Sequence, residues 1–510
     1  MSEQQPSLHI QAVHGVKWTG TSTVSVTIVN YARLVVLAHL LAPRDFGLMG
    51  MVLVITSLGS TFADMGISNA IIWKQDITQE QLSSLYWLNI MVGVAVFGVV
   101  IAVSPLVAAF FHEPRLVSLM FWASFIFPIA ALGQQFQTLL QKNLLFGRMA
   151  KVEIVSASAG AAVSIVAAFL GQGVYSLIWG QLTTTGCMAF LYVYLGWRAW
   201  RPRMILKPRN LHGLISFGLY QMGERAVNTF AYNIDYIMVG RFLGPTLLGI
   251  YMLAWQIMIA PMTKLNPILT RVAFPVFARK QTDPPGLRRG YTELSKILAI
   301  LTFPILVLAA ATAPVLVPAI FGPKWIAAIP LIQIFLLLGI FRSLANPIWS
   351  VLLAKGRADI GFALSVAVAV VSTIAFWLAA PHGLSLMAWV ESALSVLLLL
   401  VCLGILKKLI GLEYFSYLKD VGKPTLLAVA GGGATYACYR AFRGVFESGL
   451  FLLIGLLVFG ILCYAVLIAL FEREYFLEYF RLLIGKEQEN MVSGAQSGLA
   501  EELQADKDLL

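Results

Sequence analysis

Apolar stretches of about 20 residues recur along nearly the whole of this 510-residue chain. A stretch of that length is what an α-helix needs to cross a bilayer, whereas membrane-barrel strands would show alternating polarity over about ten residues. The composition agrees, because 59% of the residues are hydrophobic and 12% are charged, against roughly 45–50% and 25% in soluble domains. We therefore predict an all-α polytopic membrane protein.

Proline, glycine and charge clusters separate the apolar stretches into about 14 predicted spans. Their approximate centres are Thr27, Ser60, Val96, Phe127, Ser158, Thr185, Ala226, Pro261, Ile300, Ile340, Ala369, Leu394, Gly433 and Val458. The longest polar connection, residues 197–212, is too short to fold as a soluble catalytic domain. The pattern therefore does not indicate an enzyme, and no catalytic residue is assigned.

Lysine and arginine are distributed unevenly between the connections. Connections after even-numbered spans carry 19 of these residues, and those after odd-numbered spans carry 6. By the positive-inside rule the first set faces the cytoplasm, so both termini are predicted to be cytoplasmic. The net charge of +11 is then mainly a topology signal and does not suggest nucleic acid as a partner.

The first half of the chain is repeated in the second. Pro43 and Gly47 are matched by Pro245 and Gly249, 202 residues later, and three further landmarks recur at 209 or 210 residues. Because each half has six spans, we predict two lobes related by a pseudo-two-fold axis along the membrane normal, plus two appended helices. The predicted domains are residues 1–196 (N-lobe, spans 1–6), 197–213 (basic cytoplasmic linker), 214–406 (C-lobe, spans 7–12), 407–470 (spans 13–14) and 471–510 (amphipathic and disordered cytoplasmic tail).

The stretch from 214 to 240 is long enough to cross a bilayer, yet it contains Glu224, Arg225 and Asp235. On a helix, one face then carries a polar stripe of six residues: Arg225, Asn228, Thr229, Tyr232, Asp235 and Tyr236. An ionised group at the bilayer centre costs about 2.5–3.5 kcal/mol, so this face must look into protein or a water-filled cavity. We interpret the helix as the wall of a cavity; the alternative is a polar contact between packed helices.

Other predicted spans also carry ionisable side chains. The candidate site consists of the cations Arg33, Arg225, Lys264 and Arg342, the gate or coupling groups Asp64, Glu224 and Asp235, and the supporting polar residues Asn30, Asn228, Tyr232 and Gln256. The four cations outnumber the three carboxylates, which favours an anionic substrate group such as phosphate or pyrophosphate. Alternatively, each cation pairs with a neighbouring carboxylate or extends to an interface.

Arg33 and Asp235 are also 202 residues apart, so they occupy equivalent depths in the two halves with opposite charge. They are predicted either to bridge the lobes as a gate or to have independent partners within each lobe.

Cofactor motifs are absent from the sequence. The four cysteines lie singly inside predicted spans, no HExxH motif occurs, and no GxxxxGK[ST] loop is present. We therefore expect no metal site, no cofactor and no ATP hydrolysis.

Four segments carry a family resemblance: ARLVVLAHLLAPRDFGLMGMV, ADMGISNAII, LLQKNLLFGRMAKVE and GQGVYSLIWGQL. They resemble the polysaccharide exporters of the multidrug/oligosaccharidyl-lipid/polysaccharide (MOP) superfamily, and within it the colanic-acid-type flippases. The resemblance implies a bacterial inner-membrane flippase that moves an undecaprenyl-pyrophosphate-linked oligosaccharide repeat unit to the outer leaflet by alternating access, for exopolysaccharide or lipopolysaccharide synthesis. Spans 1, 2, 7 and 8 would line its cavity. The implied partners are the lipid-linked oligosaccharide and membrane lipids, with polymerase or assembly proteins as further candidates.

Three other functions are weighed against this one. A MATE-like drug or organic-cation antiporter would need a cavity dominated by carboxylates. A repeat-unit polymerase or ligase would need a sizeable periplasmic segment, and a purely structural membrane protein would not need paired lobes with charges inside the membrane.

Overall fold

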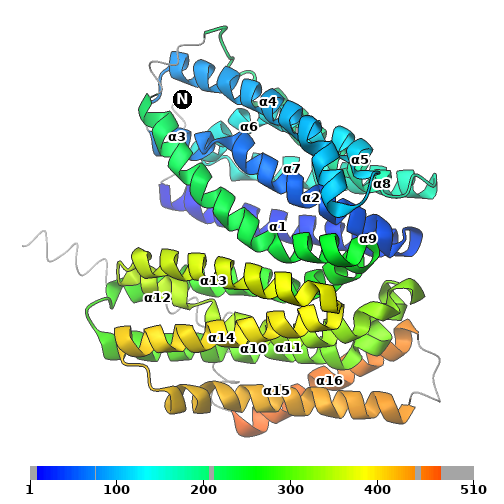
Figure 1. Cartoon of the computed structure of the whole chain (residues 1–510). Helices are drawn as coiled ribbons and strands as arrows, with labels where there is room; N and C mark the ends of the chain where they lie inside the picture. Colours follow the sequence, from blue (N-terminus) through cyan, green and yellow to red (C-terminus); the bar gives the residue numbers. More distant parts are fainter. Residues whose placement is uncertain (1–7, 75, 206–211, 443–448, 473–510) are drawn as a thin grey trace, which may run out of the picture. The chain divides into compact units, whose positions relative to one another are not determined.

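The structure is a computed structural model (Figure 1) that describes residues 8–74, 76–205, 212–442 and 449–472. Within these ranges every regular element is a helix. Residues 206–211 of the predicted linker and 473–510 of the predicted tail lie outside the described residues.

The described helices contain every predicted span centre. The first eight are α1 (Leu8–Leu40), α2 (Pro43–Asp64), α3 (Ile67–Trp73), α4 (Gln79–Phe111), α5 (Leu116–Ser124), α6 (Ile126–Lys142), α7 (Phe146–Phe169) and α8 (Tyr175–Gly196). The others are α9 (His212–Arg279), α10 (Pro284–Ile320), α11 (Ile329–Ala345), α12 (Ile348–Ala354), α13 (Ala358–Ala379), α14 (Leu384–Ile410), α15 (Tyr414–Phe442) and α16 (Leu450–Phe471), with 3-10 turns at Pro323–Ala328 and Ala380–His382. Among the described residues, 11 helical segments are long and apolar enough to cross a membrane. The prediction of an all-α polytopic membrane protein is confirmed.

Predicted spans 7 and 8 are the two parts of α9. At Gly244 the backbone leaves the helical region with φ 80° and ψ 176°, a conformation that favours glycine. Pro245 then starts the second part, where its fixed φ suits a first helical position. Pro43, the repeat partner of Pro245, starts α2 in the same way.

The chain divides into two compact units, which are described separately. Unit 1 comprises Met1–Ala260, Leu316–Leu338 and Gly356–Leu400, and unit 2 comprises Pro261–Val315, Gly339–Lys355 and Val401–Leu510. The domain boundaries taken from the repeat stay a prediction.

Small residues allow close helix packing in unit 1. Helix α7 packs against α1 and α8, and α6 packs against α8. A methyl group on Gly160 of α7 would lie 2.6 Å from the carbonyl oxygen of Gly180 on α8, and one on Gly180 would lie 2.9 Å from that of Gly160. Such close backbone approach replaces the hydrophobic driving force that is lacking between helices in lipid.

Unit 1 also brings the two copies of the repeated motif into contact. A methyl group on Gly47 would overlap the carbonyl oxygen of Pro245, and one on Gly249 would overlap that of Pro43. The contact is therefore reciprocal, as a local two-fold relation requires. We call these four residues the repeat seam.

Further contacts beside the repeat seam also join the two halves of the repeat. The Lys324 ammonium donates to the carbonyl oxygen of His39, at the end of α1, over 3.1 Å. Arg241 stands 202 residues after His39, and its Nη1 lies 2.9 Å from Nε2 of His112, at the end of α4. The end of the first span and its repeat counterpart thus each contact the opposite half of the chain.

In unit 2 a buried carboxylate joins three helices. Glu472, directly after α16, is 7% exposed. Its carboxylate lies 3.1 Å from Nζ of Lys296 on α10 and 3.2 Å from Nζ of Lys423 on α15. Two ammonium groups on one buried carboxylate hold the appended helix α16 against its neighbours.

Candidate functional site

Within unit 1, side chains of α2, α6, α8 and the first part of α9 surround a cavity of about 450 Å³. Ligand pockets in proteins typically enclose roughly 300–1,000 Å³. The walls combine apolar side chains with hydroxyls, amides and one ion pair. The cavity is therefore the candidate binding site that the described residues provide.

The ion pair joins Asp64 to Arg225. Nη1 of Arg225 lies 2.9 Å from Oδ2 of Asp64. The other carboxylate oxygen accepts a 2.7 Å hydrogen bond from Oγ of Ser68 and a hydrogen bond from the amide of Gln134. Nε2 of Gln134 also lies 3.2 Å from Oγ of Ser68. These four side chains form one network on the cavity wall, which we call the Asp64 network.

The local fold explains how α2 and α3 contribute to this network. Asp64 is the last residue of α2, and Met65 and Gly66 follow with positive φ values of 45° and 65°. This short left-handed turn redirects the chain into α3, where Ser68 reaches back to the carboxylate. Gln134 comes from the middle of α6.

The Asp64 network is charge-balanced, but the two charges differ in exposure. The Arg225 side chain is 48% exposed and that of Asp64 is 15% exposed. An arginine carries five N–H donors, and the ion pair engages one terminal nitrogen. The guanidinium therefore presents donors to the cavity while the Asp64 charge is compensated.

The other residues of the predicted stripe on span 7 do not share one environment. Thr229 lies near α2, with its Oγ1 3.3 Å from that of Thr61. Asn228 is half-buried, and Tyr232 is 77% exposed. Asp235 is 4% exposed and accepts a 3.1 Å hydrogen bond from the Tyr251 hydroxyl. The first turns of the stripe thus meet α2, while its end is packed inside unit 1.

The remaining predicted site residues lie apart from the Asp64 network. Arg33 is half-buried on α1, and Asn30 is exposed one turn earlier. Gln256 and Lys264 lie on the second part of α9 and Arg342 lies on α11, with both cations in unit 2. The side chain of Glu224 lies outside the described residues. Pairing of Arg33 with Asp235 stays a prediction.

One premise of the sequence analysis needs correction. Glu391 on α14 is 4% exposed and was missing from the deep carboxylates. With it, the count from the sequence becomes four carboxylates against four cations, and the net charge inside the membrane stays a prediction. A single acidic residue in a strongly apolar window gives only a weak sequence signal. Arg225 itself pairs with the Asp64 carboxylate, as one of the two alternatives in the sequence analysis predicted.

Neutral residues of the cavity were also missed. Gln134, Gln137 and Gln141 lie on α6 at helical spacing, and Thr185 and Tyr192 face them from α8. Helical periodicity marks the glutamine row in the sequence as it marks the stripe on span 7, but a neutral amide carries no charge that would single it out inside a membrane.

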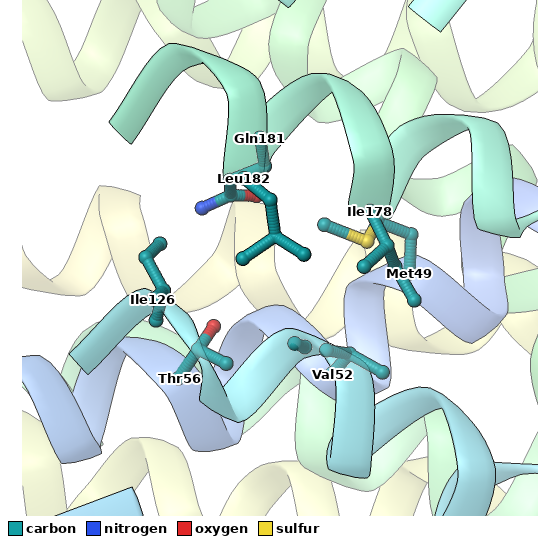
Figure 2. A pocket seen from close by; sticks show the side chains of 8 residues that line it. Met49, Val52, Thr56, Ile126, Ile178, Gln181 and Leu182 are labelled. Atoms are coloured by element: carbon teal, nitrogen blue, oxygen red, sulfur yellow. The ribbon is translucent and has the colours of Figure 1, made fainter. Parts of the chain in front are cut away.

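A second void in unit 1 belongs to helix packing. Figure 2 shows its lining of Met49, Val52, Thr56, Ile126, Ile178, Gln181 and Leu182. Its volume of about 10 Å³ holds one water molecule at most.

The fold matches solved transporter structures of one superfamily. "Lipid II flippase MurJ, inward closed conformation" aligns with a TM-score of 0.72 at 13% identity, covering 90% of this chain and 99% of that chain. An inward-facing multidrug resistance MATE family transporter of the MOP superfamily aligns with a TM-score of 0.55 at 13% identity, covering 75% and 95%. The chain therefore has the fold of MOP-superfamily transporters.

Sequence comparisons identify the family. Residues 36–330 match the family described as "Polysaccharide biosynthesis protein". The teichuronic acid biosynthesis protein TuaB of Bacillus subtilis (strain 168) is 36% identical over 84% of this chain and 89% of its own length. The lipopolysaccharide biosynthesis protein WzxC of Escherichia coli (strain K12) is 30% identical over 86% and 89%. The chain belongs to this family of polysaccharide biosynthesis proteins, and the predicted resemblance is confirmed.

Proposed function

We propose that the protein is a flippase that moves an undecaprenyl-pyrophosphate-linked oligosaccharide repeat unit from the inner to the outer leaflet, for exopolysaccharide or lipopolysaccharide synthesis. The observation that carries the proposal is a polar cavity of about 450 Å³ with a half-exposed arginine inside a bundle of membrane-crossing helices. The names of TuaB and WzxC and the fold shared with a lipid II flippase support it.

The chemistry of the cavity suits a headgroup that is both sugar-like and anionic. A polar group moving through a bilayer needs hydrogen-bonding partners in place of the water it leaves. Arg225 offers donors to phosphate or carboxylate oxygens, since its planar fork can bind such oxygens pairwise. Asp64 does not repel an anion strongly, because Arg225 already compensates its charge.

The same network counts against a MATE-like antiporter of organic cations. Such a substrate needs an available carboxylate, and Asp64 is the acidic residue among the described cavity lining. Its oxygens are engaged by Arg225, Ser68 and Gln134. A cation would have to displace Arg225 before it could bind there. No bond-breaking step is proposed for this protein.

The proposed transport cycle is alternating access in a bacterial inner membrane. If both termini are cytoplasmic, the repeat seam lies toward the periplasm and Asp64, at the other end of α2, lies toward the cytoplasm. In that orientation the repeat seam holds α2 and the second part of α9 together on the periplasmic side of unit 1, and we expect this contact to change during the cycle. Polymerase or assembly proteins that consume the flipped lipid are candidate partners.

Deletion of the gene tests the proposal. Lipid-linked repeat units should accumulate in the cytoplasmic leaflet, as measured by their protection from a periplasmic glycosidase in spheroplasts. Expression of Arg225→Ala at normal protein levels should leave that accumulation in place, whereas Arg115→Ala, at an exposed loop position, should clear it. No accumulation in the deletion strain would reject the flippase function; normal export with Arg225→Ala would remove only Arg225 from the site.

A further inference from the structure

A row of glutamines follows the cavity side of α6. Gln134, Gln137 and Gln141 are spaced by three and four residues, so they lie on one helical face, and all three line the cavity. From Gln134 to Gln141 this polar face extends for about 10 Å at 1.5 Å per residue. The cavity wall thus offers a long polar face without a charge of its own.

Several of these polar groups are not used by the protein. Gln134 bonds within the Asp64 network, but among the described residues no side-chain hydrogen bond is found for Gln137, Gln141 or Thr185. Tyr192 is 1% exposed, and its buried hydroxyl likewise has no hydrogen-bond partner in the part of the chain that the structure describes. Buried hydroxyls are nearly always bonded in proteins, and this one belongs to a residue of the cavity wall, so it is a candidate partner for a bound ligand.

The chemistry of the unused groups identifies the class of ligand. An amide side chain both donates and accepts, as a sugar hydroxyl does, whereas a phosphate group accepts only. A phosphate at Gln137 and Gln141 would leave their carbonyl oxygens without donors. Arg225 is the cation among the described lining residues, and it suits the diphosphate better.

We propose that Gln137, Gln141, Thr185 and Tyr192 form a saccharide subsite that reads the hydroxyl groups of the repeat unit, while Arg225 holds the anionic group beside it. The subsite rests on the proposed function and deepens it, because it makes glycan recognition a property of α6 and α8. It predicts that these residues distinguish a lipid with sugars from the same lipid without them.

Binding to the purified full-length protein in nanodiscs tests the subsite with two probes. The first is the lipid-linked repeat unit purified from the deletion strain, and the second is undecaprenyl pyrophosphate without sugar. Gln137→Leu combined with Gln141→Leu should raise the dissociation constant for the first probe about tenfold or more, since each hydrogen bond contributes a several-fold change. The constant for the sugar-free probe should stay within about twofold.

Tyr192→Phe gives a second variant that retains the packing of the ring. Because the hydroxyl has no hydrogen-bond partner among the described residues, its removal should leave the melting temperature unchanged and raise the dissociation constant for the repeat unit roughly three- to tenfold. The matched control is Gln172→Leu. Gln172 precedes α8, and its amide oxygen accepts a hydrogen bond from the indole N–H of Trp179. This substitution should change neither dissociation constant.

Two results overturn the subsite alone. In the first, the glutamine variant binds both probes more weakly by the same factor, which places the diphosphate at α6. In the second, both variants bind the repeat unit as tightly as the wild-type protein does. If the deletion strain yields no lipid-linked repeat unit, or the wild-type protein binds neither probe, the proposed function itself fails and the subsite falls with it.

Discussion

Replacing Gly47 with alanine perturbs the repeat seam at its closest point. The added methyl group would overlap the carbonyl oxygen of Pro245 and lie 2.9 Å from its Cα atom. Non-bonded atoms in ordinary contact are about 3.5–4.0 Å apart. Because the overlap with the carbonyl oxygen is deeper than the contact with Cα, α2 and the second part of α9 must separate by roughly 2 Å. Such overpacking costs about 1–3 kcal/mol, which shifts the closed-to-open ratio roughly 5- to 150-fold.

A cysteine reporter measures this shift. Leu248 is fully buried and contacts the position of Gly50 at the seam. In a protein whose four native cysteines are replaced, Leu248→Cys should react slowly with a membrane-impermeant maleimide on intact cells. Gly47→Ala and Gly249→Ala should each raise the labelling rate within the stated range. The labelling rate of the double variant should rise by less than the product of the two single increases, because one separated seam accommodates both methyl groups.

The control is Gly98→Ala on α4, where an added methyl group meets nothing within 4 Å. It should label like the parent. If Gly47→Ala also labels at the parent rate, the close contact is refuted. If the rate increases of the two single variants multiply in the double variant, the two glycines do not share one seam. Labelling confined to inverted vesicles would show that the seam faces the cytoplasm and that the predicted orientation is wrong.

Two further predictions concern the ion pairs. Asp64→Arg and Arg225→Asp should each lower export at least tenfold, because each places two like charges side by side. The double exchange should recover much of the lost export. Equal loss of export in all three variants would contradict an ion pair between these residues. Glu472→Gln removes the carboxylate charge that Lys296 and Lys423 share, and breaking a buried pair costs about 3–5 kcal/mol, so the melting temperature of the purified protein should fall by several degrees. Lys423→Met should have a smaller effect, since its side chain is 52% exposed, and the reverse order would contradict this account.

The helices were predictable from the sequence because apolar length alone determines where a helix can cross a bilayer. The boundary between predicted spans 7 and 8 was also accessible, since Gly244 and Pro245 form a strong local break. What length could not show is that one non-helical residue, Gly244, is enough to separate the two helices. The direction of the chain at this break depends on the φ and ψ angles of Gly244, and the neighbouring apolar residues do not indicate those angles.

The repeat seam could be half predicted. The spacing of Pro43 and Gly47 against Pro245 and Gly249 indicated duplication, but duplication does not require that the copies touch. Their reciprocal contact depends on how α2 and α9 approach each other, and glycine permits that approach without specifying it.

The Asp64 network shows where sequence reasoning stops. The membrane cost of a charge indicated that Asp64 and Arg225 need polar surroundings, yet 161 residues separate them, and spacing cannot choose between pairing, substrate binding and an interface. The glutamine row on α6 was visible by periodicity. It was missed because a neutral amide in a span carries a smaller penalty than a charge and draws less notice.

The seam and the network lie at opposite ends of the same helix. From Gly47 to Asp64, α2 extends for about 25 Å without an internal proline, so it moves as a nearly rigid rod. In the first part of α9, Arg225 stands 13 residues after the first helical residue, and Arg241, which contacts His112, follows 16 residues later near the break at Gly244. If a ligand draws Arg225 away from Asp64 and the helix follows its side chain, one rod tilts or shifts against the other, and the tight glycine contacts of the seam cannot absorb that movement by side-chain rearrangement. We expect the single charge variants at Asp64 and Arg225 to change labelling at Leu248 as well as export; export lost with labelling unchanged would show that the two ends act independently.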